Sequence, residues 1–133
     1  MIVHRDLAAG RWWTMSLEEQ LGNAGSDVGR AIRARTTGET GDETRFWPAL
    51  ERALDLLDLT LADPRWAGPR RREIARAREV VCDFLVGDNV YGSTAASLEG
   101  WFMAYAVAAR RDRGAAASDT TMPIATTMAA PTK

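Results

Sequence analysis

Four segments of this 133-residue chain carry apolar side chains at the spacing of an α-helix, and this pattern constrains the fold more than any other feature. In the first segment the apolar side chains recur every three or four positions, which places them on one face of a helix. These residues are Leu17, Leu21, Ala24, Val28 and Ile32. The same spacing is found in segments 42–62, 69–87 and 94–111. We therefore predict an all-α protein.

Residues that start and stop helices separate the four segments. Ser16 and Glu19 match the capping box, in which each side chain accepts a hydrogen bond from the other residue's backbone N–H. Asp63 and Pro64 should end the second helix, because the residue before a proline is pushed out of the helical region. Short connections make consecutive helices antiparallel neighbours. The sequence therefore predicts an antiparallel up-down four-helix bundle.

The two ends of the chain lack this helical pattern. Residues 1–15 read as an irregular N-terminal arm in front of the bundle, which spans residues 16–111. Residues 112–133 consist mainly of small and polar residues with few large apolar side chains. Such a segment cannot bury enough surface to offset the entropy of ordering it, so we predict a disordered C-terminal tail.

Composition excludes several classes of protein. The formal net charge of −1 produces no global field that would attract nucleic acid or an anionic membrane. One cysteine cannot form a disulfide within the chain, so the protein is not a disulfide-stapled secreted domain. No window reaches the roughly 18 apolar residues of a membrane span, and the first ten residues lack the apolar core of a signal peptide. We expect a cytoplasmic protein without membrane contact.

Residues with catalytic chemistry are scarce. The only histidine is His4, in the predicted arm, which leaves no histidine within the bundle to activate a serine or cysteine nucleophile. Glycine-rich phosphate loops of the Walker or dinucleotide type are absent from the sequence. We therefore predict a protein that is not an enzyme, with no cofactor, no metal site and no small-molecule substrate.

Two groups of residues are candidates for binding a partner. Gly22, Gly25 and Gly29 lie beside the apolar face of the first helix, where they either admit a second backbone closely or weaken the helix so that it frays. Trp12 and Trp13 are adjacent, so we expect one to cover the bundle and the other to be free for a partner. These features predict a protein partner or a homo-oligomer.

Charge is unevenly distributed along the chain. Segment 42–63 has six acidic residues and two arginines, whereas segment 64–79 has six arginines and two glutamates. These arginines either pair with the acidic helix beside them or contact phosphates or an acidic partner, and those in the first helical turn oppose the helix dipole. The candidates for nucleic-acid binding are Arg65, Arg70, Arg71, Arg72, Arg76 and Arg78.

The connection before the fourth helix is rich in turn-forming residues. Its spacing does not match a calcium-binding EF-hand loop, because a valine, Val90, occupies the third position. We expect Asp88 and Asn89 to accept hydrogen bonds from loop N–H groups while Tyr91 packs over the end of the bundle, with a ligand or partner contact as the alternative.

Three strings together resemble a family of small bacterial proteins with no assigned activity. They are SLEEQLGNAGSDV (16–28), DPRW (63–66) and GDNVYGST (87–94), and the resemblance covers about residues 12–111. It implies a self-contained module and adds no chemistry. At the level of fold alone, the predicted bundle is similar to the accessory variability proteins of diversity-generating retroelements, which form rings and bind a reverse transcriptase and RNA.

Two functions are consistent with these features. The first is a non-enzymatic helical module for protein interaction or self-assembly, based on the glycine face and the tryptophan pair. The alternative is an accessory protein that binds nucleic acid through segment 65–78.

Overall fold

The computed structural model describes residues 5–36 and 43–117, which contain five α-helices, one short 3-10 helix and no strand. The prediction of an all-α protein is confirmed for this part of the chain. Expectations about residues 1–4, 37–42 and 118–133, including most of the predicted tail, lie outside the described residues. The elements are α1 (Arg5–Trp12), α2 (Leu17–Thr36), α3 (Glu43–Leu61), η1 (Pro64–Trp66), α4 (Pro69–Leu85) and α5 (Ala95–Ala117).

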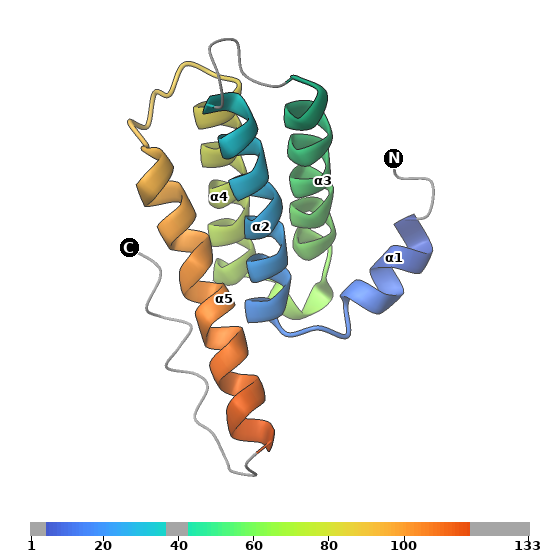
Figure 1. Ribbon diagram of the computed structural model, residues 1–133. Coiled ribbons are helices and arrows are strands. Elements are labelled where there is room, and N and C mark those ends of the chain that lie inside the picture. Colours follow the sequence, from blue (N-terminus) through green and yellow to red (C-terminus); the bar gives the residue numbers. More distant parts are fainter. Residues whose placement is uncertain (1–4, 37–42, 118–133) are drawn as a thin grey trace.

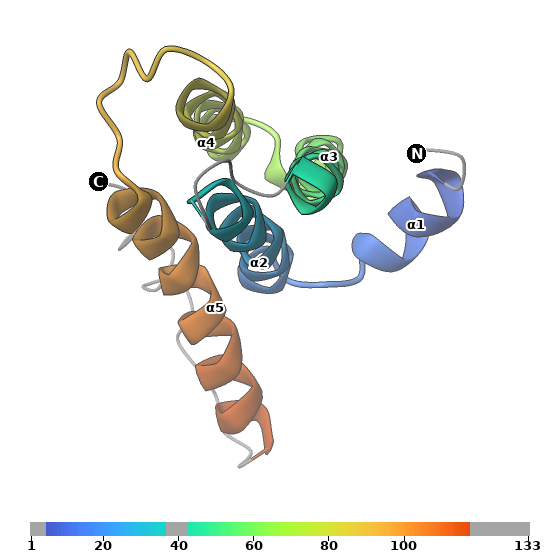
Figure 2. The ribbon, with the colours of Figure 1, turned by 45° about the horizontal axis from the view of Figure 1, so that its top comes forward.

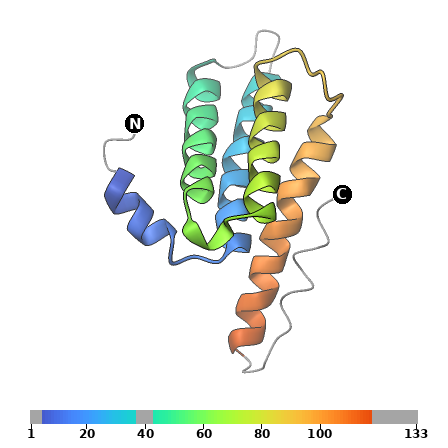
Figure 3. The same ribbon diagram turned by 180° about the vertical axis from the view of Figure 1, so that it is seen from behind.

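Helices α2 to α5 run in alternating directions, and α2, α3 and α4 lie side by side (Figure 1). The last helix is arranged differently. In the view that looks more nearly along α2, α3 and α4, helix α5 crosses them obliquely (Figure 2). It packs mainly against α2. From behind, its final turns extend past the ends of the other helices (Figure 3). The arrangement is therefore a group of three helices with α5 added to one side.

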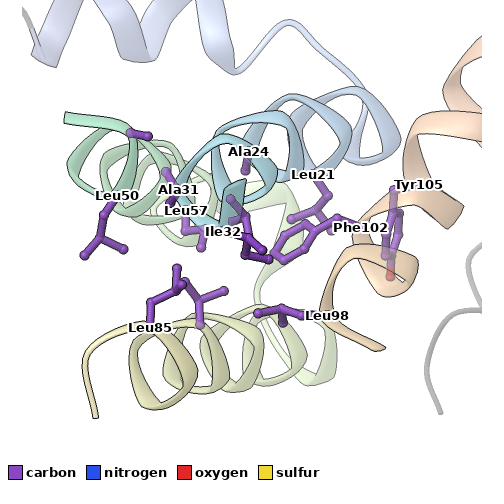
Figure 4. Close-up of a cluster of buried hydrophobic side chains, with 14 of the residues drawn as sticks. Leu21, Ala24, Ala31, Ile32, Leu50, Leu57, Leu85, Leu98, Phe102 and Tyr105 are labelled. Atoms are coloured by element: carbon purple, nitrogen blue, oxygen red, sulfur yellow. The ribbon is translucent and has the colours of Figure 1, made fainter. Parts of the chain in front are cut away.

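The core forms where all four long helices meet, and α2 is its centre. Leucines, alanines and aromatic rings from α2, α3, α4 and α5 point toward one another there (Figure 4). Burying each large apolar side chain stabilises the fold by roughly 1.5–3 kcal/mol relative to exposure. The largest apolar side chains that are fully buried are Leu21, Leu57, Ile74, Leu85, Val28 and Val81.

The N-terminal arm differs from its prediction, because eight of its described residues form a helix. Residues Arg5–Trp12 form α1, which lies against α3. Eight residues form a helix poorly on their own, so tertiary contact through the buried side chain of Trp12 accounts for it. The capping box is confirmed: the Ser16 N–H donates to Glu19 Oε1 at 3.0 Å, and the Glu19 N–H donates to Ser16 Oγ at 3.1 Å.

The fourth predicted helix is longer than expected, since α5 continues to Ala117 rather than ending near residue 111. Residues 112–117 belonged to the predicted tail because they lack large apolar side chains. Alanine and arginine, however, are among the strongest helix formers, so this sequence can continue a helix that has already started. Arg113 Nη1 lies 3.4 Å from Glu19 Oε2, which ties the extension to the start of α2.

Candidate functional site

A groove lies between α4 and α5, on the side where the oblique course of α5 leaves α4 uncovered. Its volume is about 400 Å³, within the range of roughly 300–1,000 Å³ typical of binding sites. Apolar and polar side chains line it in equal number. They are Glu73, Arg76, Ala77 and Val80 of α4, Ser93 of the connection, and Ser97, Leu98 and Trp101 of α5. We call this the α4–α5 groove.

Trp101 is the largest side chain in the α4–α5 groove and is half-buried. Its ring centroid lies 4.9 Å from that of Phe102 and 5.0 Å from that of Tyr105. Both neighbours are buried, so they hold the indole in place. The groove thus presents a positioned aromatic surface, which is the kind of side chain that contributes most to protein interfaces.

Buried ionisable side chains lie near this aromatic group. Burial is the main cause that raises the pKa of Tyr105 to about 12; the charges of Glu73 and Glu18 act in the same direction, and that of Arg70 acts against them. Tyr105 therefore keeps its proton at neutral pH and cannot act there as a general base. Glu18 is buried, and its Oε2 has no hydrogen-bond partner among the described residues.

Next to the groove, two large side chains of the α4–α5 connection are exposed to solvent. Val90 is 81% exposed and Tyr91 is 50% exposed. Both backbone N–H groups donate to Asp83 on α4, at 2.8 and 3.0 Å. The guanidinium of Arg76 lies 5.9 Å from the centre of the Tyr91 ring. Tyr91 therefore does not pack over the bundle as predicted; it extends the surface of the groove.

Asn89 stabilises the same connection through two hydrogen bonds to Ser93. Its Oδ1 accepts from the Ser93 N–H at 2.9 Å, and its Nδ2 donates to the Ser93 carbonyl at 3.0 Å. This agrees with the prediction for Asn89, while Asp83 takes the role expected of Asp88. Asn89 has a φ of +54°, a conformation that asparagine tolerates better than most residues. These contacts fix the shape of the connection.

The glycine face of α2 meets α5 of the same chain. A Cβ on Gly22 would lie 3.0 Å from the Ala106 Cα, and one on Gly25 would lie 2.4 Å from the Phe102 Cβ. At Gly29 the neighbours are the ends of side chains, with Glu99 Oε2 at 3.7 Å. The expected close approach of a second backbone is confirmed at the first two glycines, and α5 supplies that backbone.

Both tryptophans of the N-terminal arm bind α3. The indole N–H of Trp12 donates to Thr60 Oγ1 at 3.0 Å, and that of Trp13 donates to the Leu59 carbonyl at 2.9 Å. Trp12 is buried and Trp13 is half-buried. The expectation that one of the two is free for a partner is therefore wrong, because both satisfy polar groups of the same helix end.

Most of the arginines predicted to contact nucleic acid have partners within the protein. Arg65 forms an ion pair with Asp63, Nη2 to Oδ2, at 2.7 Å. Arg78 does the same with Asp58, Nε to Oδ1, at 2.7 Å, which is the expected pairing between the acidic and basic helices.

The other four arginines of this group differ in their surroundings, and the contact of Arg76 with Tyr91 is described above. Arg71 Nη2 donates to the Asp63 carbonyl at 3.2 Å, and the half-buried Arg70 lies 5.9 Å from the Trp66 ring centre. Arg72 and Arg76 are exposed. Five of the six arginines therefore contact another described group of the chain.

A buried polar cluster joins two of the three strings that carry the family resemblance. Gln20 Nε2 donates to Asp63 Oδ2 at 3.0 Å and to the Trp12 carbonyl at 2.9 Å, while Gln20 Oε1 accepts from the Trp66 indole at 2.8 Å. Asp63 also accepts from the backbone N–H and the guanidinium of Arg65. We call these five residues the polar cluster; their contacts within the chain indicate a structural role.

The pKa of Asp63 reflects this environment. Burial alone would raise it, but hydrogen bonds from Arg65 and Gln20 outweigh burial and hold the pKa below the ordinary 3.8. Asp63 is therefore ionised at neutral pH, and its charge is compensated inside the cluster.

Sequence reasoning missed a second concave surface, between α2 and α3. Four arginines line it: Arg30 and Arg33 from α2, and Arg45 and Arg52 from α3. The sequence did carry a signal for it: Arg30 and Arg33 share one face of their helix, Arg45 and Arg52 share one face of theirs, and the two helices were predicted to be antiparallel neighbours.

Among residues 5–36 and 43–117, no group of three metal-binding side chains is close enough to hold an ion. No helix in these ranges has the length and apolar character that a bilayer span requires. Comparison with family models, curated proteins and solved structures finds no match for this chain. Any functional proposal must therefore rest on the surfaces described above.

Proposed function

We propose that this protein is a non-enzymatic helical module that self-assembles through the α4–α5 groove and the adjoining side chains of Val90 and Tyr91. The observation that carries the proposal is the positioned, half-buried Trp101 in an open groove beside these exposed apolar residues. Burial of such a surface is the main favourable contribution to most protein association.

The α2 to α5 assembly is, in this proposal, an open form of the up-down four-helix bundle. In a closed bundle each helix packs against two neighbours around the core. Here α5 packs mainly on α2, and the side of α5 that carries Leu98 and Trp101 lines the groove. A second copy seated there would cover the half-buried side chains of Val80 and Trp101, which a closed bundle would bury within one chain.

The charges along α4 favour a second copy of the chain over a partner whose surface carries charges of a single sign. Arg72, Arg76, Glu79 and Asp83 lie on one face of α4, since they follow at intervals of four, three and four residues. In a symmetric dimer, residue i contacts residue j and j contacts i. Two antiparallel α4 helices related by a two-fold axis would bring Arg76 opposite Glu79 and Arg72 opposite Asp83. The face is therefore complementary to itself.

Charge reversal tests this arrangement directly. Sedimentation equilibrium should give the wild-type chain twice its mass of 14.6 kDa at high protein concentration. Arg76→Glu or Glu79→Arg should each weaken the dimer by up to about thirtyfold, because the two-fold axis repeats the ion pair and each exposed pair contributes up to about 1 kcal/mol. The double variant Arg76→Glu/Glu79→Arg should recover wild-type affinity.

A second variant tests the groove itself. Val80→Glu places a charge among the apolar lining and should leave a monomer with wild-type helical content. Trp47→Glu is the matched control, because Trp47 is an exposed apolar residue on α3 that does not line the groove, and it should dimerise normally. A monomeric wild-type chain, or equal effects of the two substitutions, would count against the proposal.

The alternative, a nucleic-acid-binding accessory protein, draws support from the exposed Arg72 and Arg76. If it is correct, a single-stranded oligonucleotide binds at about 50 mM salt and the affinity falls steeply as salt rises. Arg72→Gln/Arg76→Gln should then reduce binding with unchanged helical content. No binding by the wild-type chain at low salt would eliminate this function.

A further inference from the structure

The concave surface between α2 and α3 has a chemistry unlike the α4–α5 groove. We call it the arginine cleft; its volume is about 520 Å³. Among the described residues, its lining includes four arginines and one carboxylate. The lining consists of Asp27, Arg30, Arg33 and Ala34 of α2 and Thr44, Arg45, Pro48, Ala49 and Arg52 of α3.

A buried carboxylate organises two of the arginines. Asp27 is only 3% exposed, yet its Oδ1 lies 2.5 Å from Arg30 Nη1 and 3.9 Å from Arg52 Nη1. One anion fixed in the protein interior thus draws together cations from two different helices. A buried counter-charge of this kind holds the cationic side chains in position before a ligand binds.

Both guanidinium groups keep binding capacity after pairing with Asp27. The side chains of Arg30 and Arg52 are 57% and 62% exposed, respectively. Each guanidinium has five N–H donors, and a single carboxylate oxygen occupies few of them. Their planar, permanently charged groups match the oxygens of phosphate, to which arginine binds in pairs of parallel hydrogen bonds.

The balance of charge points to an anionic ligand. Among the described residues that line the cleft, the exposed guanidinium groups of Arg30 and Arg52 share one carboxylate, that of Asp27. Arg30 and Arg33 both also border the neighbouring surface between α2 and α5, where Glu99 lies. Arg30 and Arg52 are the two arginines that Asp27 brings together. We propose that the arginine cleft binds a small molecule with two or more linked phosphoryl groups, one for each of these two arginines. A cavity of 520 Å³ is large enough for such a ligand.

Titration calorimetry with inorganic pyrophosphate tests the proposal, and it is independent of self-assembly. The full chain should bind pyrophosphate at about 50 mM salt and more weakly at higher salt, because exposed charges are screened. Arg52→Gln should reduce the affinity by about tenfold, the loss expected for hydrogen bonds to a charged group. Arg30→Gln should reduce it at least as much.

Controls separate a specific site from general attraction to a basic protein. Arg72→Gln removes an exposed arginine on α4, outside the cleft, and should leave pyrophosphate affinity unchanged. Because Arg52 is exposed and 3.9 Å from Asp27, its replacement should leave the circular dichroism spectrum unchanged. A single-stranded oligonucleotide tests whether the phosphates belong to a nucleic acid.

Three results would overturn the proposal. The first is the absence of pyrophosphate binding at low salt. The second is binding that Arg52→Gln and Arg30→Gln leave intact, or that Arg72→Gln reduces equally. The third is binding of the oligonucleotide without binding of pyrophosphate, which would assign the cleft to nucleic acid instead.

Discussion

Replacing Asp63 with alanine should lower the free energy of unfolding by about 1–3 kcal/mol, the usual cost of leaving a buried hydrogen-bonding group without its partner. The carboxylate is 1% exposed and accepts hydrogen bonds from Gln20 and from both the backbone and side chain of Arg65. Its loss removes the acceptor of the Arg65 backbone N–H and of one Gln20 side-chain N–H. The free energy of unfolding of a small domain is only about 5–15 kcal/mol, so the midpoint of urea unfolding should shift clearly to lower urea concentration.

Asp58→Ala provides a matched control. Asp58 also pairs with an arginine, Arg78, at 2.7 Å, but both side chains are about one-third exposed. Solvent screening limits such pairs to roughly 0–1 kcal/mol. If the two substitutions destabilise the protein equally, burial of Asp63 does not have the energetic role assigned to it here.

The contribution of Asp63 should also depend on pH. Its folded-state pKa lies below 3.8, so the unfolded state binds the proton more readily than the folded state. The stabilisation is therefore complete above the unfolded pKa and is lost as pH falls through the lower folded pKa. The stability difference between the wild type and Asp63→Asn, measured by urea unfolding, should shrink below about pH 4. A difference that stays constant to lower pH would contradict this.

Gly25→Ala should destabilise the protein by about 1–3 kcal/mol, the range observed for overpacked sites. The added Cβ would lie 2.4 Å from the Phe102 Cβ, which is attached directly to the backbone of α5 and cannot rotate away. Relief of this clash requires α5 to move off α2, although alanine itself favours the helix. Thermal unfolding followed by circular dichroism measures the loss.

Gly100→Ala is the same substitution in a different environment. A Cβ at Gly100 has no neighbour within 4 Å, so the higher helix propensity of alanine should stabilise α5 by up to about 1 kcal/mol. The two variants should therefore change stability in opposite directions. A stabilising effect of Gly25→Ala would show that α2 and α5 are less closely packed than described.

Features that depend on neighbouring residues could be predicted from the sequence. The apolar face of α2 needs only the periodicity of its own segment, and the capping box needs only Ser16 and Glu19. The end of α3 before Pro64 likewise follows from a steric conflict between adjacent residues. These predictions succeed because no distant part of the chain is needed to satisfy them.

Features formed by distant residues could not be predicted in the same way. The glycines of α2 indicate close packing, but the choice between α5 and a second protein depends on how α5 crosses α2. The arginine cleft requires Arg30 and Arg52 to meet across a helical hairpin, with Asp27 buried between them. The tryptophan pair looked partly free because its acceptors, Leu59 and Thr60, lie 46 and 48 residues away in the sequence.

The indole of Trp13 has a consequence for the smallest unit that can fold. The Leu59 carbonyl is among the last four of α3, which have no N–H partner further along their own helix. Trp13, 46 residues earlier in the sequence, supplies the missing donor and thereby acts as a helix cap at long range. A chain shortened to begin at Ser16 would keep every residue of α2 to α5, yet α3 would end in an unsatisfied carbonyl. The autonomous module therefore includes the N-terminal arm.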